Sequence, residues 1–176
     1  MAKAELYWDA AALAALESAA ATLEEFDGGS NVDLFVRAFD YATDEYANLQ
    51  FQVPGEIDTS GTVTFRLYWF ARTCPNPAEN VLWAFEHSAR NGGEDYDAAY
   101  TQEVASADST GTTQDALVET VWTETVSNLG WAANDTVFGK ILRKVADAAD
   151  TFDSAGGTDD DALLVGFAIE IPLAAA

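Results

Sequence analysis

Apolar and polar positions alternate along most of the chain from about residue 31 onward. The clearest run covers residues 62–71, and every second position in it carries a large apolar side chain: Val63, Phe65, Leu67 and Trp69. Alternation with a period of two is typical of a β-strand that buries one face. We therefore expect this run to be a strand whose apolar face lies against a core.

Seven further runs show the same alternation, and turns rich in Gly, Asp, Asn and Pro separate them. They cover residues 32–36, 49–53, 81–87, 100–106, 117–126, 136–145 and 163–171. Many short strands with turns between them predict a two-sheet sandwich or a barrel. The expected fold class is all-β, a single jelly-roll-like β-sandwich of about eight strands.

Residues 9–25 interrupt this pattern and admit two interpretations. Asp9 can cap a helix, and three apolar residues recur at helical spacing in an alanine-rich stretch: Leu13, Leu16 and Ala20. In the second interpretation the segment is an irregular arm, with a strand near residues 22–26, that reaches a neighbouring subunit. We accordingly divide the chain into an N-terminal arm or short helix over residues 1–27 and a jelly-roll domain over residues 28–176.

The chain carries 30 acidic and 8 basic residues, which gives a formal net charge of -22. The charge is spread evenly, with -10 over residues 1–88 (14 acidic, 4 basic) and -12 over residues 89–176 (16 acidic, 4 basic). Such a surface repels nucleic acid and anionic lipid, so we expect no nucleic-acid partner and no membrane partner. Molar salt screens this self-repulsion, and the acidic, lysine-poor composition is typical of proteins of haloarchaea and their viruses.

The sequence holds few of the residue types that catalysis requires. Cys74 stands alone, so no intrachain disulfide forms, and no pair of Cys or His residues offers a transition-metal site. His87 is the one histidine, and it shares a face with apolar neighbours, so we interpret it as a packed or sheet-edge residue and not as a base. The first nine residues lack a basic region followed by an apolar run, so we expect neither a signal peptide nor a membrane span.

Three groups of carboxylates are candidates for a hard cation such as Ca²⁺. They are Asp147, Asp150 and Asp153; Asp159, Asp160 and Asp161; and Glu94, Asp95 and Asp97. None matches the spacing of an EF-hand loop, and chance clusters are common in so acidic a chain. We therefore interpret them as solvated carboxylates, and we expect no catalytic residue, no cofactor and no metal site.

The five tryptophans divide into two groups. Trp69, Trp83 and Trp122 alternate in phase with aliphatic neighbours, which predicts that they lie in the core. Trp8 and Trp131 sit beside turns and are candidates for a subunit contact.

Several segments together carry a resemblance to a known family: residues 62–69 (TVTFRLYW), 81–83 (VLW), 93–95 (GED) and 144–153 (KVADAADTFD), with a closing strand to Pro172. They resemble a jelly-roll family of small structural proteins of tailed viruses, several of which are capsid decoration proteins. The resemblance covers roughly residues 28–172. The sequence departs from the pattern at residues 143–147, where RKVAD replaces an expected Arg-Asp pair.

The resemblance implies a virion structural protein at the capsid surface, a homotrimer that clamps adjacent major capsid proteins. We expect four of the few basic residues to pair with acidic groups in these interfaces, and two tryptophans to lie there as well. The expected subunit or capsid contacts are Trp8, Arg37, Arg66, Arg72, Trp131 and Arg143. The alternative is a receptor- or glycan-binding head of a viral fibre or turret. That alternative would use the two tryptophans and the loops at 91–97 and 108–115.

Overall fold

The computed structural model describes residues 2–15, 19–27, 33–73, 78–97, 99–152 and 161–175. Within these residues lie ten β-strands and one short helix. In chain order they are β1 (Lys3–Asp9), β2 (Thr22–Asp27), β3 (Asp33–Phe39), β4 (Glu45–Gln52), β5 (Thr62–Ala71), β6 (Asn80–Arg90), β7 (Gln102–Ser109), β8 (Val118–Thr125), α1 (Val126–Leu129), β9 (Thr136–Arg143) and β10 (Ala162–Pro172).

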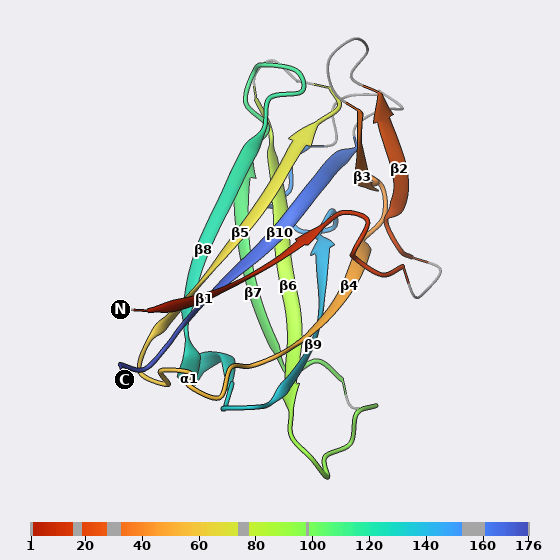
Figure 1. Cartoon of the computed structure of the whole chain (residues 1–176). Helices are drawn as coiled ribbons and strands as arrows, with labels where there is room; N and C mark the ends of the chain where they lie inside the picture. Colours follow the sequence, from red (N-terminus) through yellow and green to blue (C-terminus); the bar gives the residue numbers. More distant parts are fainter. Residues whose placement is uncertain are drawn as a thin grey trace.

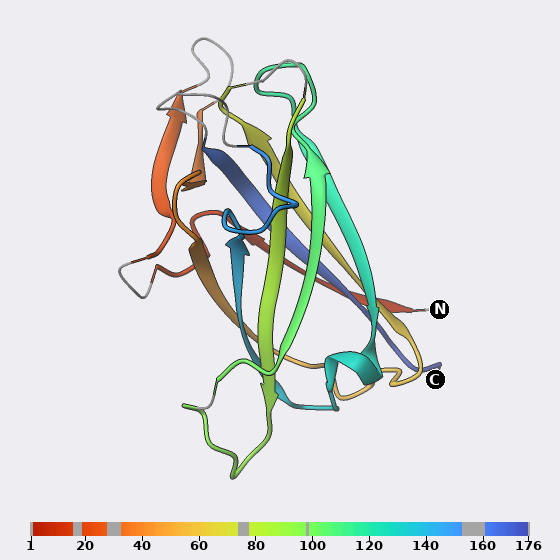
Figure 2. The same ribbon diagram turned by 180° about the vertical axis from the view of Figure 1, so that it is seen from behind.

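The strands form two sheets packed face to face. The six-stranded sheet has the order β2-β3-β10-β5-β8, with β1 paired to β10, and the four-stranded sheet has the order β4-β9-β6-β7. Every paired neighbour within the sheets is antiparallel. Figure 1 views the sandwich from the side of the six-stranded sheet, and Figure 2 views it from the side of the four-stranded sheet. The expected all-β, jelly-roll-like sandwich is confirmed.

The two strands beyond the expected eight come from the N-terminal segment. β1 pairs with β10 from Lys3↔Pro172 to Asp9↔Gly166, and the N- and C-terminal ends of the described chain lie side by side (Figure 1). β2 pairs with β3, which confirms the strand expected near residues 22–26. Residues 1–27 therefore contribute two strands to the six-stranded sheet.

The helical interpretation of residues 9–25 is wrong for the part of that segment that the structure describes. Ala14 forms an antiparallel bridge to Asn48, and Ala20 forms a parallel bridge to Tyr46, so the segment follows the edge of β4. Leu16 lies outside the described residues. Alanine suits either conformation, and here bonds to a distant strand outweigh its local helix propensity.

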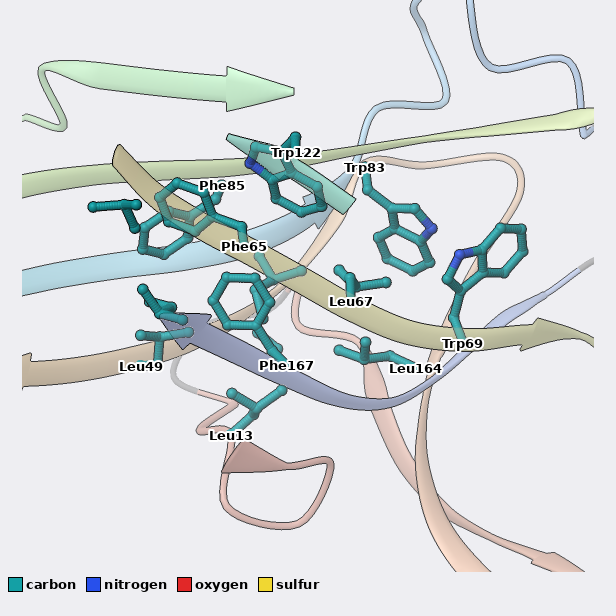
Figure 3. Close-up of a cluster of buried hydrophobic side chains, with 14 of the residues drawn as sticks. Leu13, Leu49, Phe65, Leu67, Trp69, Trp83, Phe85, Trp122, Leu164 and Phe167 are labelled. Carbon is teal, nitrogen blue, oxygen red and sulfur yellow. The ribbon is translucent and has the colours of Figure 1, made fainter. Parts of the chain in front are cut away.

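The main core lies between the two sheets and is rich in aromatic rings (Figure 3). Trp69 and Trp83 are fully buried and meet edge to face, with ring centroids 5.7 Å apart. The Trp69 indole N–H donates a hydrogen bond to the Thr120 hydroxyl at 2.8 Å. Trp122 stacks on Phe65 at 5.7 Å, so the prediction that Trp69, Trp83 and Trp122 lie in the core is confirmed.

A second, smaller cluster lies on the outer face of the six-stranded sheet. Its buried members are Val36, Ala38, Phe70 and Leu163. Phe26 of β2 covers it and meets Phe70 edge to face at 4.8 Å. Strand β10 is thus buried on both faces, which explains its nearly continuous apolar sequence.

The face to which alternate side chains of β10 point changes partway along the strand, which the alternation in the sequence did not predict. The alternation predicted that Leu163 and Val165 share a face with Phe167, but the register shifts between Leu164 and Gly166. As a result Leu164 and Phe167 point into the main core, whereas Leu163 and Val165 pack with the second cluster. One extra residue in a strand moves every later side chain to the opposite face.

Replacing Gly139 by alanine should destabilise the fold by about 1–3 kcal/mol, the usual cost of overpacking a core. Gly139 lies in β9 opposite His87, and an added Cβ would overlap the ring of Phe85. Urea denaturation in molar KCl measures the loss. Gly92→Ala is the matched control because nothing lies within 4 Å of its added Cβ. Equal stability of the two variants would contradict this account.

Candidate functional site

All eight basic side chains lie in the described part of the chain, and each has an acceptor within the same chain. Six form ion pairs: Lys3–Glu170, Arg66–Glu119 and Arg66–Glu170, Arg72–Glu24, Lys140–Glu86, Arg143–Asp150 and Lys144–Glu103. The other two donate to backbone carbonyl oxygens: Arg37 and Arg90. Six of the eight positive charges are therefore paired with carboxylates of the same chain. Because 30 acidic residues face only 8 basic ones, the chain keeps a large excess of negative charge.

Three of the six residues expected at a subunit or capsid contact are buried within the single chain. Arg143 is 0% exposed, Trp131 is 3% exposed and Arg37 is 6% exposed. Their side chains therefore do not reach a partner in this conformation, and the expectation is corrected for them. The structure leaves the other three expected residues partly exposed: Trp8, Arg66 and Arg72.

Arg143 sits at the end of β9 and holds the loop that follows. Its Nε and Nη2 atoms each lie 3.0 Å from a carboxylate oxygen of Asp150, and it also donates to the carbonyl oxygens of Phe39 and Phe152. Asp150 in turn accepts a hydrogen bond from the backbone N–H of Leu82 at 3.0 Å. The interpretation of Asp150 as a solvated carboxylate is wrong, because its side chain is only 3% exposed.

The other members of the acidic groups are placed differently. Asp147 is exposed and accepts a hydrogen bond from the backbone N–H of Ala149. Asp153, Asp159 and Asp160 lie outside the described residues. Across the ranges that the structure describes, no group of three or more His, Cys, Asp or Glu side chains is arranged to hold a metal ion.

Arg37 anchors the N-terminal segment onto the sandwich. Its guanidinium donates to the carbonyl oxygens of Ala10 and Ala21, each at 3.1 Å, and to that of Leu13. Burial lowers the pKa of Arg37. The side chain thus satisfies three carbonyl groups whose residues lie outside the helix and strands that the structure describes. A local sequence pattern does not reveal bonds of this kind.

His87 is fully buried between the sheets, which confirms that it is a packed residue. Its ring stacks on Phe85 at 5.0 Å, and its Nδ1 accepts a hydrogen bond from the Trp131 indole at 3.3 Å. Its Nε2 has no hydrogen-bond partner among the described residues. Desolvation by burial lowers the pKa of His87 to about 4, so the ring is neutral near pH 7.

A network of charges crosses the outer face of the six-stranded sheet. Arg66 of β5 reaches Glu170 of β10 and Glu119 of β8, each at 2.8 Å, and Lys3 of β1 also pairs with Glu170. Hydrogen bonds from Lys3 and Arg66 lower the pKa of Glu170. The network ties four strands together on a partly solvated surface, where each pair contributes little to stability.

Next to this network lies a largely apolar surface, with one carboxylate, that we call the Tyr7–Phe35 patch. It surrounds a hollow of about 210 Å³ and consists of Tyr7, Asp9, Ala11, Leu34, Phe35 and Val165. Tyr7 is 56% exposed and Phe35 is 57% exposed. A Cβ added at Gly166 would overlap the Tyr7 ring, so the glycine lets that ring lie close against β10.

A larger depression, which we call the aromatic hollow, lies beside β4 and β9 of the four-stranded sheet. It has a volume of about 400 Å³ and is lined by Trp8, Ala12, Ala14, Asn48, Leu49, Gln50, Tyr100, Phe138 and Gly139. The sequence indicated Trp8 as a contact residue but did not indicate the hollow. Its residues come together only because β1, β4, β9 and the loop before β7 meet there.

No protein-family model matches the chain, and no curated protein sequence matches it. Among solved structures it is similar to the mosquito-larvicidal Cry4Aa toxin from Bacillus thuringiensis, with a TM-score of 0.51 and 11% identity. That similarity covers 97% of this chain and 24% of the toxin chain, so this chain spans about a quarter of that protein's length. At this identity the similarity establishes a shared fold only.

Two further solved structures give lower scores. The CBM22-1 xylan-binding domain from Paenibacillus barcinonensis Xyn10C has a TM-score of 0.41 and 9% identity, over 96% of this chain and 87% of that one. Dimeric latent PorU from Porphyromonas gingivalis has a TM-score of 0.40 and 7% identity, over 96% of this chain and 12% of that one.

In the described residues, no helix is both long and apolar enough to cross a bilayer.

Proposed function

We propose that this chain is a non-enzymatic structural protein of a virus particle, which decorates the capsid as a homotrimer bound to the major capsid protein. The proposal combines the sequence resemblance with one structural observation, the exposed Tyr7–Phe35 patch. Two large aromatic side chains are more than half exposed around one apolar hollow. Contiguous apolar surface of this kind marks interaction sites on soluble proteins.

The patch is held in shape by the sheet beneath it. Tyr7 packs against Gly166 of β10, and its ring lies 6.5 Å from that of Tyr68 on β5. Leu34 and Val165 belong to the second apolar cluster, which supports the patch from within the sheet. A rigid surface loses little conformational entropy when a partner covers it, which favours its use in assembly.

The charge distribution favours an apolar contact over an ionic one. Every basic side chain already has an acceptor in its own chain, so few cations remain to pair with another copy. Copies that each carry a formal charge of -22 repel one another unless salt screens them. In a cyclic trimer each chain would contribute the Tyr7–Phe35 patch to one subunit interface and a different surface to the other interface.

The mass of the chain in molar KCl tests this function. We expect analytical ultracentrifugation to give a trimer for the native sequence and a monomer for Phe35→Asp. The introduced aspartate would bury a carboxylate at each subunit interface. Leu117→Asp is the matched control, since Leu117 is 63% exposed and does not line the patch. A monodisperse monomer for the native chain, or a trimer that survives Phe35→Asp, would overturn the proposal.

A further inference from the structure

The aromatic hollow differs from the rest of the surface in its charge. Charged residues make up 22% of the chain, yet none of the nine residues that line the hollow is charged. A depression without charge on so acidic a protein favours a neutral ligand, because the surrounding carboxylates repel anions and the hollow offers no carboxylate to a cation. Its volume of about 400 Å³ lies within the range of roughly 300–1,000 Å³ typical of small-molecule sites.

The rings of the hollow are held in place by contacts with the neighbouring loop and strand. Phe138 of β9 meets Tyr96 edge to face at 5.4 Å, so the loop between β6 and β7 folds over the end of β9. The Lys140 ammonium lies 5.3 Å from the centre of the Tyr100 ring and 5.1 Å from that of Tyr46. These contacts fix the aromatic surfaces before any ligand arrives.

Lys140 does not bring net charge to the rim of the hollow. Its ammonium pairs with Glu86 of β6 at 2.8 Å. The cation is therefore neutralised by its own sheet and acts on the two tyrosine rings as a support. The four-stranded sheet that carries these groups faces the reader in Figure 2.

Two amide side chains supply hydrogen bonds on the same face. The Gln50 amide is exposed and makes no hydrogen bond with the described part of the chain, so its donor and its acceptor are both available. The Asn48 amide nitrogen lies 3.5 Å from the carbonyl oxygen of Ala14, which leaves its oxygen as an acceptor. Because each amide both donates and accepts, the pair suits adjacent hydroxyl groups.

We propose that the aromatic hollow binds a neutral carbohydrate. The C–H face of a sugar ring packs against Tyr100 and Phe138, and its hydroxyl groups bond to Gln50 and Asn48. Aromatic faces supply apolar contact at low entropic cost, and amides supply the directional bonds that fix the sugar's orientation. The hollow and the Tyr7–Phe35 patch are lined by different residues, so carbohydrate binding and trimer formation are separable.

Isothermal titration in molar KCl tests this inference with neutral hexasaccharides of glucose, galactose, mannose and N-acetylglucosamine. A hexasaccharide of glucuronic acid is the anionic control. We expect at least one neutral sugar to bind, the anionic sugar to bind more weakly, and Phe138→Ala to weaken binding about tenfold, a change of about 1.4 kcal/mol. Gln50→Ala should weaken binding roughly three- to tenfold, the contribution of one hydrogen bond.

Tyr7→Ala is the matched aromatic control, and it should leave sugar binding unchanged. Phe138→Ala should in turn leave the mass of the assembly unchanged, so failure of one proposal is distinct from failure of the other. Folding of each variant is checked by its near-ultraviolet circular dichroism. The inference is overturned if none of the neutral sugars binds the folded chain, or if the anionic sugar binds as tightly as the neutral ones. It is also overturned if Phe138→Ala and Gln50→Ala bind sugar as tightly as the native chain.

Discussion

Replacing Arg143 by methionine is expected to lower the free energy of unfolding by about 3–5 kcal/mol, the usual cost of removing one partner of a buried ion pair. Methionine fills much of the same space but leaves the Asp150 carboxylate buried without its cation. The change also removes the donors to the carbonyl oxygens of Phe39 and Phe152. Urea denaturation in molar KCl measures the loss, with the slope of the transition confirming two-state behaviour.

Lys144→Met is the matched control for this experiment. Lys144 is the next residue along the chain, and it pairs with Glu103 at 2.8 Å on a partly exposed surface. An exposed pair contributes at most about 1 kcal/mol, and molar salt reduces that further. Losses of equal size in the two variants would contradict the structural importance of the buried pair.

A second variant separates the ion pair from the space that it fills. In Arg143→Met combined with Asp150→Leu no buried charge remains at this site, so stability should recover by about 1 kcal/mol or more relative to Arg143→Met alone. The recovery is incomplete, because the backbone N–H of Leu82 loses its carboxylate acceptor. If the double variant is less stable than Arg143→Met, the unpaired carboxylate is not the cause of the loss.

The stability of the fold should fall by about 3 kcal/mol between pH 6.5 and pH 4 through His87 alone, since one pKa unit corresponds to 1.36 kcal/mol. Burial lowers the pKa of His87 from 6.5 in the unfolded chain to about 4 in the folded chain. Between these values the unfolded state holds the extra proton, so unfolding becomes easier as the pH falls. The contribution becomes constant well above pH 6.5 and levels off well below pH 4.

His87→Gln isolates this contribution from that of the carboxylates. Glutamine retains an acceptor for the Trp131 indole N–H but does not titrate. The carboxylates are the same in both proteins, so the difference between the two curves of stability against pH reports His87. Parallel curves across the window would show that burial of the imidazole does not disfavour its charged form.

The strands of the central sandwich could be predicted because strand geometry is local. Successive side chains of a strand point to opposite faces, so the apolar residues of 62–71 indicate both the strand and its buried face. The same pattern correctly placed Trp69, Trp83 and Trp122 in the core. β1 shows the same alternation, with Leu6 and Trp8 partly buried and packed on the core, so this strand also carries a local signal in the sequence.

The destinations of the polar side chains could not be predicted in this way. Arg143 and Asp150 are seven residues apart, yet their burial depends on Phe39 and Leu82 from other strands. Arg37 was expected at a contact between subunits, whereas it bonds to carbonyl oxygens of the segment that precedes β2. A charged residue looks the same in the sequence whether its partner is another chain, the solvent or a backbone carbonyl.

The sequence by itself determined that the chain is an acidic, all-β sandwich with an aromatic core, since strand alternation and composition are read residue by residue. The tertiary structure decided which face each end of β10 presents, where every cation finds its acceptor, and which distant residues line the aromatic hollow. These features depend on register and on contacts between segments far apart in the chain. Such contacts arise from the packing of whole sheets, and no local pattern encodes them.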